Sequence, residues 1–180
     1  MGKKFFTSDT HFGHNNIIKY ENRPFTTVEE MDEALIKNWN SVVDENDEVY
    51  ILGDFSFHKD PEKTLGILQQ LNGRKYLILG NHDRQILKNR KLKEQFMWIK
   101  DYHRLKIDGY NLVLFHYPIQ VWDCRHHGAI HLYGHVHSNA HNHSMEYDIP
   151  YSYNVGADVN DFTPICLDDI LIGLYKKWGI

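Results

Sequence analysis

Short apolar runs alternate with segments of helical periodicity along the chain. The runs have the length and the β-branched and aromatic content of buried strands, and turn-forming residues bound them. They occupy residues 4–8, 48–52, 76–79, 110–115, 129–133 and 151–155. Strands that alternate with helices predict an α/β protein with a largely parallel sheet, in which the carboxyl ends of the strands meet along one edge.

Four segments are predicted to form helices. The first begins near Thr27, which stands three residues before Glu30 as in a capping box, and it carries Met31, Leu35 and Trp39 on one face. The others are predicted for residues 61–71, 84–95 and 167–177. Pro at the start of the second helix, and acidic residues early and basic residues late in the last one, suit helix ends.

Residues 98–107 alternate imperfectly between apolar and polar side chains, and Asp108-Gly109 follows them directly. An Asp-Gly pair between two strand-like runs is typical of a tight hairpin turn. We therefore expect a hairpin that leads into the run 110–115.

The composition is that of an ordinary globular protein, except for 13 histidines. The 180 residues are 42% hydrophobic and 24% charged, and this length predicts a single domain over residues 1–180. The formal net charge of −4 and the pI of about 6.3 argue against a general nucleic-acid binder. Residues 84–106 are rich in Lys and Arg, which favours a solvated helix face over a polyanion-binding patch.

No run reaches the length that spans a membrane, and the N-terminal run turns polar at Thr7, too early for a signal peptide. Cys124 and Cys166 lie far apart and form no CxxC pair, so we expect two ordinary thiols. These features predict a cytoplasmic protein without a membrane partner.

The apolar runs end in residues that can bind metal ions. In chain order these are Asp9 with His11, Asp54, Asn81 with His82, His116, and His135 with His137. An Asp and a His two positions apart in an extended segment point the same way and can share one ion. Because the carboxyl ends of parallel strands converge, we expect all of these side chains to meet in one cleft.

The stretch Gly80-Asn81-His82-Asp83 follows the run 76–79. Alone, such a string is typical of a polar turn in which the Gly lets the backbone turn sharply. With partners at the other strand ends, the Asn can offer a neutral oxygen to a cation, and the His can bind metal or move a proton. The Asp is then expected to orient the His82 ring.

The same residues resemble a known signature. Asp9-x-His11, Gly53-Asp54, Gly80-Asn81-His82-Asp83, His116 and Gly134-His135-x-His137 are similar, in this order, to the five blocks of the calcineurin-like metallophosphoesterases. Residues 11–15, 23–25, 71–74, 116–118 and 154–156 further resemble small single-domain bacterial and phage members, so the likeness covers nearly the whole chain. It implies an α/β/β/α sandwich of two mixed β-sheets flanked by helices.

The resemblance also implies a role for each block. Asp9, His11 and His137 would bind one divalent ion. Asn81, His116 and His135 would bind a second. Asp54 would bridge the two ions, and His82 would stay off the metals.

Physical chemistry supports such a pair of ions. One carboxylate can hold two cations about 3.5–4 Å apart, the separation usual in two-metal hydrolases. Imidazole, carboxylate and amide ligands without a thiolate suit Mn, Fe, Zn, Co or Ni, and of these we expect Mn²⁺. The reaction predicted is hydrolysis of a phosphate ester by a metal-activated hydroxide. Protonated His82 would stabilise the transition state or donate a proton to the leaving oxygen, and Asp83 would orient the His82 ring.

Further polar and aromatic residues close to the blocks are candidate substrate contacts. They are His14, Asn15, Arg23, Tyr117, Trp122, Arg125 and His126. Six of the seven have a second interpretation. It is a turn role for His14 and Asn15, a surface position for Arg23, simple packing for Trp122, and an irregular surface segment for Arg125 and His126. His141 and His143 could add an auxiliary metal site, since histidine-rich tracts sometimes bind metal.

Three functions compete. The first is a phosphoesterase, for which we expect a small phosphodiester because small members of the family often prefer one. A phosphomonoester or a nucleic acid is the alternative substrate, and nucleic acid is not favoured because of the acidic pI. The second is a non-catalytic scaffold on the same fold. The third is a histidine-rich metal-binding protein, which would not depend on His82. The oligomeric state does not follow from the sequence.

Overall fold

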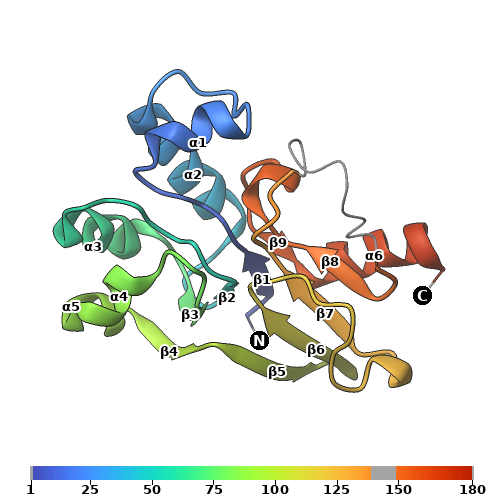
Figure 1. The fold of residues 1–180 in the computed structure, drawn as a ribbon. Helices are drawn as coiled ribbons and strands as arrows, with labels where there is room; N and C mark the ends of the chain where they lie inside the picture. Colours follow the sequence, from blue (N-terminus) through green and yellow to red (C-terminus); the bar gives the residue numbers. More distant parts are fainter. Residues whose placement is uncertain (1, 139–148, 180) are drawn as a thin grey trace.

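The computed structural model describes residues 2–138 and 149–179, so the predicted auxiliary site at His141 and His143 lies outside the described residues. Two β-sheets are stacked in the middle of the molecule, and helices flank them (Figure 1). This arrangement confirms the α/β/β/α sandwich of two mixed sheets, and it replaces the single, largely parallel sheet expected from strand and helix alternation alone.

The first sheet is parallel except at one edge. Strands β1 to β4 run parallel, and the short β9 pairs antiparallel with β1. In spatial order the strands are β4 (Phe96–Lys100), β3 (Arg74–Ile78), β2 (Glu48–Ile51), β1 (Lys4–Thr7) and β9 (Ile165–Cys166). The carboxyl ends of β1, β2 and β3 therefore lie side by side.

The second sheet is also mixed. Its order is β5 (Tyr102–Ile107), β6 (Tyr110–Phe115), β7 (Ile130–Tyr133) and β8 (Ser152–Asn154), with β6, β7 and β8 parallel. The predicted hairpin is confirmed, because β5 and β6 pair antiparallel around Asp108 and Gly109, whose φ angles of 49° and 89° are both positive. Positive φ at both central residues is what a type I′ hairpin turn requires.

The imperfect alternation of residues 98–107 now has a physical reason. The segment contains the end of β4 and all of β5, which belong to different sheets and are separated at Asp101. Each strand buries a different face, so the period of two is interrupted where the chain passes from one sheet to the other.

Helices cover the outer face of the first sheet. They are α1 (Asn15–Tyr20), α2 (Val28–Val42), α3 (Pro61–Gln70), α4 (Arg84–Lys88) and α5 (Arg90–Lys93). Thr27 caps α2 as predicted, since its side chain accepts a hydrogen bond from the backbone N–H of Glu30. The single helix predicted for residues 84–95 is wrong: Asn89 is extended between α4 and α5, and its side chain caps α5 by accepting from Leu92.

Two layers of apolar side chains hold the sandwich together. The first lies between the outer helices and β1, β2 and β3, with Leu35 and Trp39 of α2 and Leu68 of α3 almost fully buried. The second lies between the sheets and includes Leu114 of β6 and Leu132 of β7. The last helix, α6 (Leu167–Trp178), packs against β1, β8 and β9. Burial of one such side chain stabilises the fold by about 1.5–3 kcal/mol, so the strands and their end loops are held rigidly.

Among the described residues, no helix combines the length and apolarity that a membrane crossing needs. Two short 3₁₀ helices lie in the loops, η1 (Arg125–His127) before β7 and η2 (Ala157–Val159) after β8. The second of these reaches the site described next.

Candidate metal centre

The loops that follow β1, β2, β3, β6 and β7 meet at one end of the sandwich. Backbone hydrogen bonds join the loops in pairs: Asp9 donates to Gly53 at 3.0 Å, and Gly134 donates to His116 at 2.9 Å. Side-chain carboxylates connect the rest, because Asp83 Oδ2 accepts the N–H of Asp54 at 2.9 Å and Asp9 Oδ2 accepts the N–H of His135 at 2.8 Å. The strand-end side chains are therefore brought together as expected, whereas a cleft around them stays a prediction. The two sheets contribute jointly, because the first three loops belong to one sheet and the last two to the other.

Left-handed backbone conformations are concentrated in these loops. Positive φ angles of 53°, 54°, 53°, 71° and 47° occur at Asp9, His11, Asp54, His135 and His137. Residues other than Gly rarely adopt this conformation, and several of them together mark a site whose geometry is imposed by the surroundings. The expectation that Asp9 and His11 lie in an extended segment is therefore wrong. The two side chains still meet, because both residues leave the strand in the same unusual conformation.

Glycine is required at three of the strand ends. Gly53 has a φ of 92°, which a side chain would strain. A Cβ on Gly80 would collide with the Asp54 carboxylate, and one on Gly134 would collide with the side chains of Ser8 and Asp9. Gly80 has no positive φ, so its role is close approach to Asp54 and not the sharp backbone turn that we expected.

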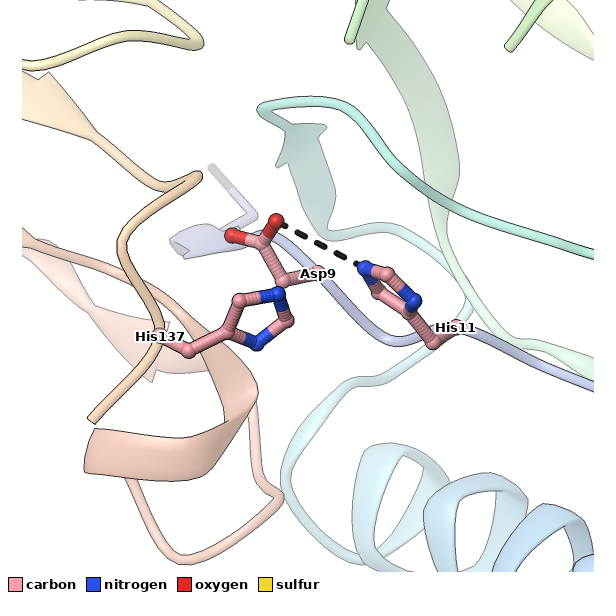
Figure 2. A group of neighbouring side chains, drawn as sticks. All are labelled: Asp9, His11 and His137. Atoms are coloured by element: carbon pink, nitrogen blue, oxygen red, sulfur yellow. Dashed lines mark ion pairs between the residues drawn. The ribbon is translucent and has the colours of Figure 1, made fainter. Parts of the chain in front are cut away.

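A first group of potential metal ligands consists of Asp9, His11 and His137 (Figure 2). One ligand atom from each lies within 4.8 Å of the others, and Asp9 Oδ1 is 3.9 Å from His11 Nε2. Both of these atoms are buried, and neither has a hydrogen-bond partner in the described part of the chain. A buried oxygen and nitrogen that face each other without partners are costly unless something binds them, and a cation fits both lone pairs.

Charges around Asp9 agree with this. Burial alone would raise the pKa of Asp9, but the facing ring of His11 and the nearby rings of His116 and His137 hold the pKa well below its usual value. Asp9 is therefore a carboxylate. Its other oxygen accepts hydrogen bonds from the Ser8 hydroxyl and from the backbone N–H of His135, which leaves Oδ1 for an ion.

A second group consists of Asp54, His116 and His135, whose ligand atoms again lie within 4.8 Å of one another. Asn81 joins this group, because its Oδ1 is 3.1 Å from His116 Nε2. The opposite nitrogen of His116, Nδ1, is 2.6 Å from the carbonyl oxygen of Leu52 and donates to it. The ring therefore presents the Nε2 lone pair to the centre, which is the orientation a metal ligand needs.

Asp54 lies between the two groups. Its Oδ2 is 3.8 Å from His11 Nε2 of the first group and 3.7 Å from His116 Nε2 of the second. The side chain is almost fully buried, and Oδ1 accepts the backbone N–H of His82 at 2.9 Å. One carboxylate is thus within reach of both groups.

His82 lies beside the two ligand groups and is open to solvent. Its side chain is 47% exposed, and its Nε2 lies 3.9 Å from Asp54 Oδ2. The ring packs against Phe57, with centroids 4.6 Å apart. Because both cations and anions can reach it from solvent, His82 is placed to meet a ligand that enters the cleft.

The expectation that Asp83 orients the His82 ring is wrong. Both Asp83 oxygens face the backbone: Oδ2 accepts from Asp54 at 2.9 Å and from Gly80 at 2.8 Å, and Oδ1 accepts from Phe55 at 3.0 Å. Burial raises the pKa of Asp83, and these hydrogen bonds only partly oppose the rise. Asp83 therefore braces the loops after β2 and β3, and the contact that limits the His82 ring is Phe57.

Arg23 is not a substrate contact. Its side chain is fully buried and forms an ion pair with Asp158, a residue of η2 that the sequence did not single out. Its remaining donors reach the carbonyl oxygens of Asp9 and Thr10 at 2.8 and 2.9 Å. A guanidinium held in this way cannot reach a phosphate in the cleft, because no part of it is exposed.

Arg125 and His126 also lie in the wrong place for substrate contacts. They lie in η1, before the amino end of β7, whereas His135 and His137 follow its carboxyl end (Figure 1). Trp122 is packed, with its indole N–H donating to the Ala129 carbonyl at 2.8 Å, and Arg125 lies over its ring.

The other candidates lie at the centre or its rim. His14 is in contact with the first group, since its Nδ1 is 3.0 Å from Nδ1 of His11 and its ring stacks on Phe57. Burial, together with the charges of His11 and His82, lowers the pKa of His14 to about 4, so the ring is neutral near neutral pH. Tyr117 lies against the ring of His135, and Asn15 is exposed at the start of α1. A substrate role for these three stays a prediction.

Comparison with known proteins shows the family of the chain. A family profile described as calcineurin-like phosphoesterase matches residues 3–153. The chain is 40% identical over 184 aligned positions to the uncharacterized protein MJ1445 of Methanocaldococcus jannaschii, and the alignment covers 98% of this chain and 93% of that protein. It is 33% identical to the Gene 66 protein of Mycobacterium phage D29, over 92% of this chain and 93% of the phage protein.

A solved structure is similar over almost its full length. The protein of unknown function AQ665 from Aquifex aeolicus superposes with a TM-score of 0.76 at 30% identity, and the match covers 96% of this chain and 99% of that one. The profile covers 151 of the 180 residues, and the relatives match over nearly the whole chain. The chain therefore belongs to the calcineurin-like phosphoesterase family.

Proposed function

We propose that this chain hydrolyses phosphate esters with the help of two divalent metal ions, and that its preferred substrate is a small phosphodiester. The position of Asp54 carries the proposal. Its Oδ2 lies between His11 of one ligand group and His116 of the other, at 3.8 and 3.7 Å. A carboxylate shared by two groups of nitrogen and oxygen ligands is the arrangement of two-metal hydrolases.

The ligand sets fit two ions of the same general kind. Asp9, His11 and His137 would hold the first. Asn81, His116 and His135 would hold the second, with Asp54 between them. Nitrogen and oxygen ligands without sulfur suit Mn, Fe, Zn, Co and Ni, and we propose Mn²⁺ as the ion to test first. When bound, two such ions lower the pKa of a water molecule and withdraw charge from phosphoryl oxygens.

The side chains around the ligands supply the rest of the chemistry. His82 is half exposed beside Asp54, so its Nε2 can donate a proton to the leaving oxygen of an ester or stabilise charge that develops there. Phe57 restricts the ring to the side of the cleft. His14 and Tyr117 lie at the rim, where they can contact the organic part of a substrate.

A small substrate fits the surface charges better than a polymer does. The basic residues of the 84–106 segment are partly neutralised, since Arg90 pairs with Glu94, Lys91 with Glu62, and Arg104 with Asp123. These pairs reduce the positive charge that the segment offers to a polyanion, although Arg84, Lys88 and Lys93 form no ion pair among the described residues. This supports a solvated surface beside the cleft, and a cytoplasmic enzyme acting on a small diester remains our proposal.

The test is hydrolysis of bis(p-nitrophenyl) phosphate, a diester, and p-nitrophenyl phosphate, a monoester. Each is incubated with protein stripped of metal and with protein reloaded with Mn²⁺. We expect turnover only after reloading, and a higher kcat/KM for the diester. A higher value for the monoester would overturn the diester preference. Absence of turnover with two ions bound per chain would overturn the hydrolase and favour a non-catalytic metal-binding module.

The role of His82 has its own variant. His82→Ala is expected to lower kcat by roughly 10²–10⁴-fold, the contribution of a positioned general acid, while the bound metal stays at the wild-type level. His127→Ala is the matched control, because His127 is an exposed histidine of η1, before the amino end of β7. Loss of metal from His82→Ala would show that His82 is a ligand and would refute its assignment as the acid.

A further inference from the structure

A buried ion pair borders the first ligand group without belonging to it. Arg23 Nε donates to Asp158 Oδ1 at 2.7 Å, and Arg23 Nη2 donates to Asp158 Oδ2 at 2.9 Å. The guanidinium therefore binds the carboxylate in a bidentate manner, through two parallel hydrogen bonds. The two side chains are 0% and 2% exposed. Burying two charges is costly unless each keeps good partners, which raises the question of what this pair positions.

Asp158 contacts a ligand of the first group. Its Oδ2 is 2.7 Å from Nδ1 of His137. A carboxylate paired with a guanidinium can only accept hydrogen bonds, so the proton of this contact resides on His137 Nδ1. In a neutral ring the lone pair is then on Nε2, and Figure 2 shows one ring nitrogen of His137 turned towards Asp9 while the other is turned away.

The guanidinium also holds the opposite side of the group. Arg23 Nη2 donates to the carbonyl oxygen of Asp9 at 2.8 Å, and Nη1 donates to that of Thr10 at 2.9 Å. Asp9 has the left-handed backbone conformation, with a φ of 53°. One buried side chain therefore connects the loop that carries Asp9 with η2, which carries Asp158, and through Asp158 it connects to the loop that carries His137.

The other ligand rings are oriented differently. His116 Nδ1 donates to a backbone carbonyl, that of Leu52, and His11 Nδ1 faces the ring of His14. Only for His137, among these three rings, is the partner a carboxylate that belongs to an ion pair. A side-chain substitution can therefore remove the orientation of His137 while the other two rings keep theirs.

Building on the proposed function, we propose that Asp158 and Arg23 are positioning residues for the metal centre. Asp158 fixes the Nδ1–H tautomer of His137, so that Nε2 faces the first ion. Arg23 holds Asp158 and the Asp9 loop in their positions relative to each other. Neither residue touches the substrate. Such partners of metal-binding histidines typically account for about 10–100-fold in metal affinity.

The tautomer can be tested without any metal. Long-range ¹⁵N–¹H NMR of the metal-stripped protein distinguishes a ring that carries its proton on Nδ1 from one that carries it on Nε2. We expect His137 to be the Nδ1–H tautomer in the wild type and to lose this preference in Asp158→Asn, in which the amide NH₂ can face the ring. A wild-type His137 in the Nε2–H form would overturn the proposal, whatever the enzyme hydrolyses.

Metal binding gives the second test. Mn²⁺ titration of Asp158→Asn is expected to show one ion bound at wild-type affinity and the other bound about 10–100-fold more weakly. Arg23→Lys keeps the charge but loses the paired hydrogen bonds, so we expect a smaller loss of affinity at the same site. Wild-type affinity for both ions, or equal weakening of both, would overturn the proposal.

The matched control is Asp32→Asn. Asp32 Oδ2 is 2.9 Å from Nε2 of His58, and the two side chains are 14% and 16% exposed. The pair has the same chemistry and forms no hydrogen bond with a proposed ligand; Asp32 Oδ1 accepts the backbone N–H of Gly13 at 2.9 Å, an acceptor that Asn keeps. We expect this variant to bind both ions as the wild type does. Selective loss of the first ion in Asp32→Asn as well would show a general effect of destabilisation and would overturn the role of Asp158. Since neither readout uses hydrolysis, failure of the proposed function would be seen separately.

Discussion

Replacement of Asp83 by alanine tests the role that the structure gives to this carboxylate. Asp83 is 1% exposed and accepts three backbone N–H groups, those of Asp54, Phe55 and Gly80. In Asp83→Ala these buried donors lose their acceptor, at about 1–3 kcal/mol for each group left unpaired. Removal of a buried charge offsets part of this, because burial raises the pKa of Asp83 and its ionisation is therefore costly.

We expect a net loss of about 3 kcal/mol in the free energy of unfolding, a large part of the 5–15 kcal/mol typical of a domain. Asp83→Asn should lose less free energy of unfolding, about 1–2 kcal/mol. The amide keeps one oxygen that can accept hydrogen bonds, and its NH₂ group faces only some of the three backbone N–H donors. His82→Ala is the neighbouring control and should stay within about 0.5 kcal/mol, since the ring is half exposed and its ring nitrogens accept no buried backbone donor among the residues that the structure describes.

The assay is urea unfolding followed by circular dichroism, with EDTA present so that metal binding does not contribute to stability. The expected order of stability is wild type and His82→Ala together, then Asp83→Asn, then Asp83→Ala. If Asp83→Ala unfolds within about 1 kcal/mol of the wild type, the loop-bracing role is wrong. If His82→Ala is destabilised as strongly as Asp83→Ala, the two side chains act together, as the sequence alone suggested.

Three further outcomes follow from the structure. Gly134→Ala should destabilise the protein by about 1–3 kcal/mol and weaken metal binding, because the added methyl group collides with Ser8 and Asp9. Gly66→Ala, in the open interior of α3, is the control and should stabilise the protein by up to about 1 kcal/mol. Equal effects of the two substitutions on urea unfolding would contradict this prediction. Burial lowers the pKa of His131 to about 4, so the unfolded chain binds a proton between about pH 6.5 and 4 that the folded chain does not, and about 3 kcal/mol of stability is lost as the pH falls through this range. His131→Gln should lose correspondingly less between pH 7 and pH 4.5, and an equal loss would show that His131 is not the group responsible. Mn²⁺ at 100 times its dissociation constant should stabilise the protein by about 2.7 kcal/mol for each site. The melting temperature should therefore rise, and EDTA should reverse the rise. An unchanged melting temperature would argue against a metal centre built from the two ligand groups.

Local patterns were sufficient for most of the strands and for the residues that end them. The apolar runs, the capping position of Thr27 and the Asp108-Gly109 turn predicted elements that the structure contains. Prediction failed where an element is short or changes partner. Asn89 interrupts a segment of helical composition, and the chain passes between sheets at Asp101. Neither event changes the composition enough to be visible in a sequence window.

The roles of charged residues were the hardest to predict. The sequence suggested a surface or phosphate-binding position for Arg23, and Asp158 belongs to no motif that the sequence analysis identified. Their ion pair joins positions 135 residues apart, so no local spacing records it. Asp83 follows His82 directly in the chain, but a neighbouring position does not decide which way a side chain points, and its oxygens turn to the backbone of two loops.

The sequence by itself determined which side chains could make a metal centre, because each follows an apolar strand and strand ends of parallel sheets gather at one edge. It also determined the family, through the order of those blocks. Only the tertiary structure decided how they are arranged. Two sheets had to stack before Asp54 could lie between His11 and His116, and long-range burial had to pair Arg23 with Asp158 beside His137. Such contacts depend on distances in space that no pattern along the chain specifies.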